Sequence, residues 1–289
     1  EGPIEVFRKT IDLGFAYMIF GDYIQEIRKE PSLSDGNLVY SGKLMGLCGY
    51  GKVRNEWLEP IKKFYLAKPD GLNYKSLLNI LWSEMNLVVN ERNGDVGGIR
   101  EQTAYDVAAT SQKVFEELFF DLVTDEINKH PDYPICITGG CGLNVLLNTA
   151  VKKRFNRAMY VAPNSSDCGI SVGCLLSQLK PKSPVNIMYS GPTALDHESF
   201  GQHFYQESYR LNVVPMDRLP KFLAEGKIIG VIRGGSEHGP RALGNRSILC
   251  NPTFPKMKDV LNSKVKHREW YRPFAPVVKV ETANTYFDI

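Results

Sequence analysis

Ile135-Cys136-Ile137-Thr138-Gly139-Gly140-Cys141-Gly142-Leu143-Asn144 is the stretch that decides the fold class. Its apolar start predicts a short buried strand over residues 135–138, the glycines predict a turn, and a helix is expected over residues 143–153. Residues 159–161, Met-Tyr-Val, predict the next strand. Strand, glycine turn, helix and strand make up a βαβ unit, which implies a parallel sheet. The sequence therefore predicts an α/β fold.

Helical patterns lie on both sides of this unit. Residues 103–129 carry apolar side chains on one face and predict the clearest helix of the chain. Residues 11–29 predict one amphipathic helix that ends before Pro31. A helix of small residues is expected to end near Leu179. We expect residues 37–53 to be glycine-rich and short-turned, whereas residues 54–100 give no clear assignment.

A second domain is predicted after a linker at residues 180–184, Lys-Pro-Lys-Ser-Pro. We place the boundary near residue 185. Beyond it the sequence predicts a helix start at residues 220–225, a strand at residues 227–232 and a helix at residues 256–263. A chain of 289 residues is long enough for two ordinary domains or a single large one.

Composition narrows the classes of function. The net charge of the whole chain is only +3, so the overall charge does not predict nucleic-acid binding. The charge is uneven, because residues 226–289 hold 11 Lys and Arg against 5 Asp and Glu, and the remainder holds 24 against 27. No apolar stretch approaches the ~20 residues that span a membrane. Six cysteines without metal-binding spacing are typical of a reduced compartment, so we expect a cytoplasmic protein.

The basic excess gathers around the segment Glu237-His-Gly-Pro-Arg-Ala-Leu-Gly-Asn-Arg-Ser-Ile-Leu249. Arg241 and Arg246 flank Gly244 on a non-helical turn and can converge on one anion. Solvated surface charge is the simpler interpretation, but these arginines alternate with apolar residues, and partly enclosed charges require a partner. Ser247 can bond a phosphate or its own backbone. The other candidates around this segment are Arg233, Lys264, Lys266, His267 and Arg268.

The glycine turn is a second candidate site. Gly139 and Gly140 precede a helix N-terminus, where backbone amides can bind an anion, although such turns serve simple packing equally often. Asn144 and Asn148 lie one helical turn apart and can hold a ribose or a base. Asp167 can cap a helix or bind a hard cation. Lys43 belongs to Ser-Gly-Lys-Leu-Met-Gly, which is not a Walker A loop, and a solvated lysine is slightly favoured there.

These motifs resemble a known family. Residues 237–249, followed by Lys-Val-Lys-His-Arg-Glu-Trp-Tyr-Arg-Pro-Phe-Ala-Pro at residues 264–276, resemble the YrdC-like domain of O-carbamoyltransferases that modify antibiotics and nodulation factors. Residues 41–47, 138–144 and 166–169 look like an actin-like ATPase (ASKHA) domain. The resemblance implies the second half of an ASKHA domain over residues 1–185 and a YrdC-like α/β domain over residues 186–289. The family's His-x-x-x-His and His-x-Asp-Gly-Thr-x-Arg motifs are absent, so we expect an interior fragment.

The resemblance also implies an activity in two steps. Carbamoyl phosphate and ATP give carbamoyl-AMP, and the carbamoyl group then passes to the hydroxyl of a small molecule or sugar. The first step is assigned to Arg233, Arg241, Arg246, Ser247, Lys264, Lys266, His267 and Arg268. The nucleotide in the second step is assigned to Gly139, Gly140, Asn144, Asn148 and Asp167, with the Lys43 loop lining the channel near the transferred group.

Cofactors and partners follow from the same resemblance. Mg²⁺ would accompany ATP. The complete ASKHA domain would hold a divalent metal such as iron through Asp167 and two histidines of the absent motif. A homodimer is compatible with the sequence, whereas nucleic-acid and membrane partners are not expected.

Three other functions remain open at this point. A threonylcarbamoyl-adenylate or tRNA-modification enzyme would use bicarbonate and threonine and would need a broader basic surface. An ASKHA sugar kinase would leave the basic segment without a role. An ASKHA-type nucleotide-binding scaffold would lack catalysis altogether.

Overall fold

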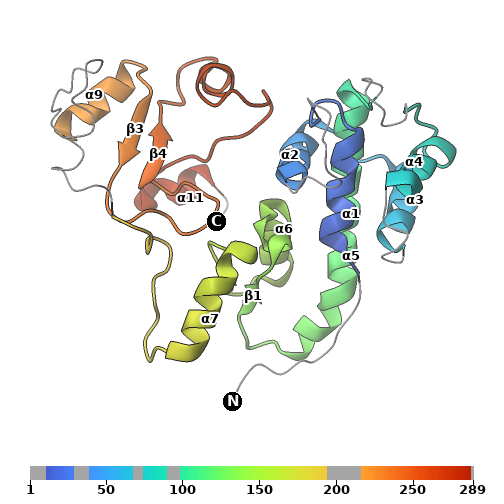
Figure 1. The fold of residues 1–289 in the computed structure, drawn as a ribbon, viewed down its shortest axis with the longest axis horizontal. Coiled ribbons are helices and arrows are strands. Elements are labelled where there is room, and N and C mark those ends of the chain that lie inside the picture. The colour runs from blue at the N-terminus through green and yellow to red at the C-terminus, as the bar shows by residue number, and fades with distance from the viewer. Residues whose placement is uncertain (1–10, 29–38, 68–73, 90–97, 194–215, 288–289) are drawn as a thin grey trace.

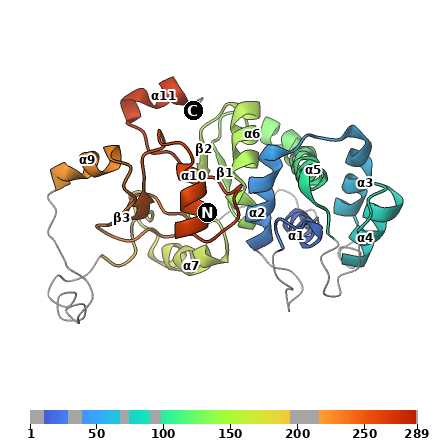
Figure 2. The ribbon, with the colours of Figure 1, turned by 90° about the horizontal axis from the view of Figure 1, so that it is seen from above.

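The computed structural model describes residues 11–28, 39–67, 74–89, 98–193 and 216–287. In Figures 1 and 2, a helical bundle occupies one end of the molecule and a β-hairpin with short helices occupies the other. A small parallel sheet with two helices lies between them in both views. None of the helices in the described ranges is long and apolar enough to cross a membrane.

The bundle surrounds one long helix, α5 (Glu101–Lys129), which confirms the helix predicted over residues 103–129. Its inner face buries Val107, Val114, Phe115 and Leu118, as expected for an apolar stripe at helical spacing. Four shorter helices complete the bundle: α1 (Leu13–Ile19), α2 (Val39–Leu47), α3 (Asn55–Tyr65) and α4 (Tyr74–Ser83).

The single helix predicted over residues 11–29 is wrong in its second half. Helix α1 ends at Ile19, and a 3₁₀ turn, η1 (Phe20–Tyr23), follows it. Ile24 then pairs with Ile99 in a parallel β-bridge. The amide of Ile99 donates to the Tyr23 carbonyl at 2.7 Å and the amide of Gln25 to the Ile99 carbonyl at 3.0 Å. Backbone pairing with a distant segment therefore overrides a helical apolar pattern.

The short turns predicted over residues 37–53 are also wrong for most of that range, because residues 39–47 form α2 and only η2 (Cys48–Tyr50) is a tight turn. Tyr40, Leu44 and Leu47 of α2 are buried. Gly46 of α2 faces the C-terminal part, since a Cβ there would make ordinary van der Waals contact, at 3.6 Å, with both the Tyr271 ring and Pro273. Residues 37 and 38 lie outside the described residues.

The predicted βαβ unit is confirmed. Strands β1 (Ile135–Ile137) and β2 (Met159–Val161) pair in parallel, with Ile135 opposite Met159. Helix α6 (Val145–Phe155) connects them and ends at Asn156 in the left-handed conformation. Helix α7 (Ile170–Leu179) follows through the 3₁₀ turn η5 (Asp167–Gly169). The sheet places the glycine turn at the carboxyl end of β1 and the Asp167 loop after β2.

The C-terminal part is built on an antiparallel hairpin of β3 (Ile229–Ile232) and β4 (Arg246–Leu249). The predicted strand at residues 227–232 thus begins two residues late, and its partner strand was not predicted. The remaining elements are α9 (Leu219–Ala224), α10 (Met257–Val260), the π-helical turn η7 (Leu261–Val265), η8 (Val280–Thr282) and α11 (Ala283–Tyr286), together with η6 (Met216–Arg218). Residues 194–215 lie outside the described residues.

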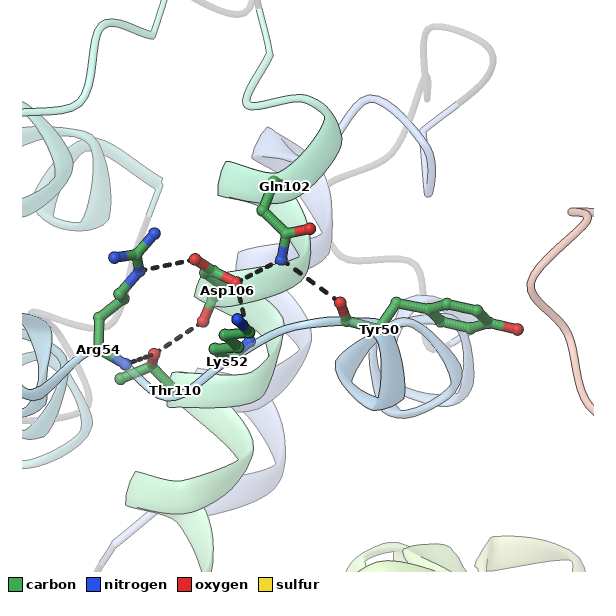
Figure 3. A network of polar contacts seen from close by, with 6 residues as sticks. All are labelled: Tyr50, Lys52, Arg54, Gln102, Asp106 and Thr110. Atoms are coloured by element: carbon green, nitrogen blue, oxygen red, sulfur yellow. Dashed lines mark hydrogen bonds and ion pairs between the residues drawn. The ribbon is translucent and has the colours of Figure 1, made fainter.

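Asp106 fastens the loop between η2 and α3 to the long helix (Figure 3). Its buried carboxylate accepts hydrogen bonds from the Lys52 amide at 2.8 Å, from Gln102 at 2.7 Å and from Arg54 Nε at 2.6 Å. The loop approaches α5 so closely that a Cβ at Gly51 would lie 1.9 Å from the Tyr105 carbonyl oxygen. Burial raises the pKa of Asp106, but these hydrogen bonds outweigh it and hold the pKa below its ordinary value.

We expect Asp106→Asn to lower the free energy of unfolding by about 2–4 kcal/mol at pH 7, because the amide replaces an acceptor with a donor facing Arg54. Since the pKa is lowered in the folded state, ionised Asp106 stabilises the fold above its unfolded pKa of about 4. The deficit should therefore shrink as pH falls below about 4. Urea unfolding across pH measures both effects.

Asp121→Asn is the matched control for this experiment, since Asp121 is exposed and lies 3.9 Å from Lys62. Its effect should stay below about 0.5 kcal/mol at every pH. An equal loss of unfolding free energy in Asp106→Asn and Asp121→Asn would contradict a specific role for Asp106.

Candidate functional site

The basic segment forms a closed loop between β3 and β4. The Glu237 carboxylate accepts hydrogen bonds from the amides of Leu243 and Asn245, both at 2.8 Å, and from the amide of Arg246 at 3.1 Å. The amide of Gly244 donates to Ser247 Oγ at 2.9 Å. Ser247 therefore bonds its own loop, one of the two roles predicted for it, and its hydroxyl proton is left to donate elsewhere.

Arg246 is used within this loop. Its guanidinium donates to the carbonyl oxygens of Arg233 at 2.7 Å and of Asn245 at 3.0 Å. Longer bonds reach the carbonyls of Pro192 at 3.2 Å and of Gly234 at 3.3 Å. Arg246 thus cross-links the backbone of the hairpin, and these bonds favour a supporting role over the convergence with Arg241 that the spacing suggested.

Arg233 and Arg241 are the more available cations of the loop, since both side chains are exposed. Arg233 donates from Nε to Asn245 Oδ1 at 3.1 Å. Arg241 Nη2 lies 3.5 Å from the Leu143 carbonyl, which is a long contact for a hydrogen bond. The structure therefore brings Arg241 beside the glycine turn, 98 residues earlier in the chain.

Gly239 explains how the two segments come so close. It adopts a φ of +120°, and a Cβ there would lie 2.1 Å from the Pro163 carbonyl oxygen. A side chain is excluded at this position because backbone packs directly on backbone. The basic loop consequently contacts two loops of the N-terminal part. One is the glycine turn, and the other is the segment after β2 that leads to Asp167.

The glycine turn itself is open. Gly139 has a φ of +87°, and a Cβ added at Gly139 or Gly140 would meet no atom within 4 Å. Both residues are exposed and precede α6 through the 3₁₀ turn η4 (Gly140–Leu143). The opposite side is tightly packed, since a Cβ at Gly142 would lie 3.2 Å from Ser165 Cβ. This geometry leaves space at the turn for a phosphate or a ribose.

Asn144 and Asn148 do not form the expected pair. Asn144 lies outside the helix as its N-cap, with Oδ1 accepting from the Leu147 amide at 3.0 Å. Its buried carboxamide also exchanges hydrogen bonds with Gln112, which in turn accepts one from Tyr17 at 2.7 Å. Asn148 Nδ2 donates to the Gly142 carbonyl at 2.8 Å. The two residues do lie one helical turn apart, since the Asn148 amide donates to the Asn144 carbonyl at 3.1 Å, but both side chains bond within the turn instead of facing a ligand.

Asp167 stands exposed in the first turn of η5, and Ser166 takes the capping position. Within the described ranges, no group of three or more His, Cys, Asp or Glu side chains could hold a metal ion. A divalent metal bound through Asp167 alone does not fit these residues.

Lys43 is not the solvated lysine that the sequence favoured. Its ammonium lies 2.8 Å from Glu269 Oε1 and donates to the Ile27 carbonyl at 3.2 Å, with the side chain 17% exposed. Arg272 reaches the other Glu269 oxygen at 3.6 Å. Burial raises the pKa of Glu269, whereas the hydrogen bond from Lys43 and the neighbouring cations hold it below its ordinary value. Glu269 belongs to the second basic motif, so this ion pair joins the two parts of the chain.

The cations of the second motif divide into two groups. Lys264, Lys266 and His267 are exposed, and His267 adopts a φ of +45°. Arg268 donates to Asn262 Oδ1 at 2.8 Å and stacks on Phe274 with its guanidinium 4.5 Å from the ring centroid. The first three can meet a ligand directly, whereas Arg268 supports its own loop.

Sequence reasoning missed several residues that organise this site. Glu237 and Glu269 are acidic residues inside basic motifs. The sequence pointed to a role for them only through the general rule that cations buried together require an anion. Gln112 gave no signal, because a single polar residue on a helix face is usually solvated. Tyr271 is buried at 1% exposure, although it lies in a charged segment.

Comparison with known proteins places the chain in a family. The family described as carbamoyltransferase N-terminus matches residues 4–176, and the one described as carbamoyltransferase C-terminus matches residues 220–289. The protein therefore belongs to the carbamoyltransferase family. The boundary predicted near residue 185 falls between the two matches and stays a prediction.

Individual relatives agree with this assignment. Nodulation protein U of Sinorhizobium fredii is 30% identical over 99% of this chain and 53% of its own length. Nodulation protein NolO of Bradyrhizobium diazoefficiens is 30% identical over 86% of this chain and 46% of its own. An uncharacterised protein of Methanocaldococcus jannaschii is 28% identical, with coverages of 99% and 47%. The chain spans about half the length of these curated relatives.

We expect Lys43→Met to destabilise the protein by about 3 kcal/mol, because it leaves the buried Glu269 carboxylate with only the more distant Arg272. The double variant Lys43→Met/Glu269→Gln should recover part of the loss, since the buried carboxylate is then neutral and only the more exposed Arg272 loses a partner. Thermal unfolding and amide hydrogen exchange over residues 262–274 report the two effects.

Lys63→Met is the control, because Lys63 forms its ion pair with Glu84 on the surface, with the lysine side chain 68% exposed. Its cost should not exceed about 1 kcal/mol. Unchanged exchange over residues 262–274 in Lys43→Met would rule out a role for the ion pair in holding that segment.

Proposed function

We propose that this protein is a carbamoyltransferase that forms carbamoyl-AMP and transfers its carbamoyl group to an acceptor hydroxyl. The observation that carries the proposal is the contact of the basic loop with the glycine turn, made by Arg241 against Leu143 and by Gly239 against Pro163. Residues 1–185 would act as the second half of an ASKHA-like domain and residues 186–289 as a YrdC-like domain.

The first step needs cations that neutralise phosphate groups. Water would hydrolyse carbamoyl phosphate to carbamate and phosphate, and a carbamate oxygen would then attack the α-phosphorus of ATP and displace pyrophosphate. Negative charge therefore develops on the oxygens of both leaving groups. Arg233 and Arg241 are exposed and make few hydrogen bonds within the protein, which suits them to these oxygens. Lys264, Lys266 and His267 are exposed on the second motif and would serve the same step. Arg246, Ser247 and Arg268 would keep those cations in place through bonds within their loops.

The second step needs a nucleotide site beside the first. The open backbone at Gly139 and Gly140 would accept the phosphate or ribose of carbamoyl-AMP, with Asn144 and Asn148 fixing the shape of the turn. Carbamoyl-AMP is prone to hydrolysis, and the direct contact between the two loops would shorten its path and limit its exposure to water. A small-molecule or sugar hydroxyl would then attack the carbamoyl carbon, lose its proton and displace AMP.

Mg²⁺ would enter bound to ATP, where it lowers the charge of the phosphates, and the exposed carboxylate of Asp167, in the loop after β2, would be its candidate ligand from the protein. No step is assigned to a further divalent metal, because the described residues offer Asp167 no cluster of three His, Cys, Asp or Glu side chains.

The proposal is tested by calorimetric titration with carbamoyl phosphate, with and without ATP and Mg²⁺. Saturable binding of both ligands, followed by pyrophosphate release when they are mixed, is the expected result. Binding of ATP without carbamoyl phosphate would redirect the assignment to a kinase-like or threonylcarbamoyl-type activity. Binding of neither ligand would contradict a site built from these two loops.

We expect Arg241→Ala to weaken carbamoyl phosphate binding by about 10- to 100-fold, as expected for losing charge-assisted hydrogen bonds to a phosphate. Folding should be unaffected, because Arg241 is exposed and makes one long contact. Arg218→Ala is the matched control, since Arg218 is an exposed arginine in the same part of the chain. Equal affinity in wild type and Arg241→Ala would remove Arg241 from the site.

A further inference from the structure

Backbone amides of the basic loop converge on a single point. The amides of Leu243, Asn245 and Arg246 all donate to Oε1 of Glu237, at 2.8, 2.8 and 3.1 Å. Convergent amides of this kind are a common binding site for phosphate and other anions. Here the anion is supplied by the chain itself, from the first residue of the motif.

Glu237 stays ionised in this position. Although burial raises the pKa of its carboxyl group, the hydrogen bonds from Leu243, Asn245 and Arg246 lower it to about 2. A carboxylate with so low a pKa is a poor general base at neutral pH. The three amide bonds to Glu237 favour a role in holding the loop over one in proton transfer.

The contact closes a ring of backbone that contains Arg241. One end of the ring is Glu237 and the other is Leu243, and Arg241 lies between them. Within the ring, Gly239 packs on the Pro163 carbonyl, and Arg241 reaches the Leu143 carbonyl. Gly244, at a φ of +108°, turns the chain so that the amides can face inward. The position of Arg241 thus depends on a contact that it does not itself make.

We propose that Glu237 is a positioning residue that occupies the amide cluster of the basic loop and thereby directs the substrate phosphate to Arg241 beside the glycine turn. The inference rests on the proposed function, because it presumes that Arg241 binds the phosphate. It adds that the amide cluster is withheld from the substrate, although its geometry suits an anion.

The test compares Glu237→Ala, Arg241→Ala and the double variant by calorimetry with carbamoyl phosphate. Glu237→Ala should weaken binding at least tenfold, and the double variant should bind no more weakly than Arg241→Ala, because Glu237 acts through Arg241. Glu237→Gln keeps an acceptor oxygen of the same reach, so it should fall between wild type and Glu237→Ala. It also serves as the second variant if Glu237→Ala unfolds, and circular dichroism checks the fold of each.

Chemical rescue gives a readout that a general loss of stability would not. Acetate carries the carboxylate that Glu237→Ala lacks, so millimolar acetate should fill the vacated amide cluster and restore carbamoyl phosphate affinity by about threefold or more. The same acetate should leave wild type and Arg241→Ala unchanged. Rescue by acetate also separates this role from non-specific anion binding. An anion bound non-specifically would compete with carbamoyl phosphate and lower its affinity instead of restoring it.

The two hypotheses fail separately. If Arg241→Ala binds carbamoyl phosphate as wild type does, the proposed function loses its phosphate site. If Arg241→Ala is impaired while Glu237→Ala is not, only the positioning role is overturned. Independent effects that multiply in the double variant, or no response to acetate, would also overturn it.

Discussion

The buried ion pair between Lys43 and Glu269 is the interaction on which the arrangement of the molecule depends. It connects α2 in the helical bundle to the second basic motif, 226 positions along the chain. Tyr271 inserts its ring beside Gly46 of the same helix, and Tyr50 donates to the Tyr271 carbonyl at 3.5 Å. Burying two charges is costly unless they meet each other with good geometry. The pair therefore specifies one docked position more than it adds stability.

Docking at this position has a consequence at a second contact between the two parts. There Gly239 packs on the Pro163 carbonyl backbone to backbone, which tolerates little displacement, and the Arg241 guanidinium reaches the Leu143 carbonyl. The Gly239 contact is steric and involves no charged group, whereas the Lys43–Glu269 pair is electrostatic and does not require close backbone packing. The two contacts together fix the basic loop over the glycine turn. Neither part of the chain carries the candidate site alone.

The sequence predicted those elements whose evidence is local. Helix α5 and the β1–α6–β2 unit follow from apolar spacing and from glycines between a strand and a helix, and both were confirmed. Helix α2 was missed because Gly42 and Gly46 were taken as turn signals. The helix instead packs on Tyr271, which lies beside Gly46 although it is 225 positions away, and such a contact leaves no trace in local periodicity. The early end of α1 has the same origin in the bridge between Ile24 and Ile99.

At the candidate site, the role of a residue is harder to predict from the sequence than the fold is. Arg241 and Arg246 are the same residue type in one motif. The Arg246 guanidinium nevertheless donates hydrogen bonds to backbone carbonyls, while the Arg241 side chain remains exposed. Only the path of the backbone separates them, since a guanidinium bonds whichever oxygens lie within its reach. Glu237 and Glu269 extend the argument to the acidic residues, because Glu237 binds backbone amides of the basic loop and Glu269 pairs with Lys43, whose loop the family resemblance places near the transferred group. A dense basic motif must supply anions of its own wherever its cations or amides are enclosed. The residues left for a ligand are those that internal anions and carbonyls hold least. In the basic loop these are Arg233 and Arg241, whose exposed side chains make a single bond to Asn245 and a single long contact with Leu143 among the described residues.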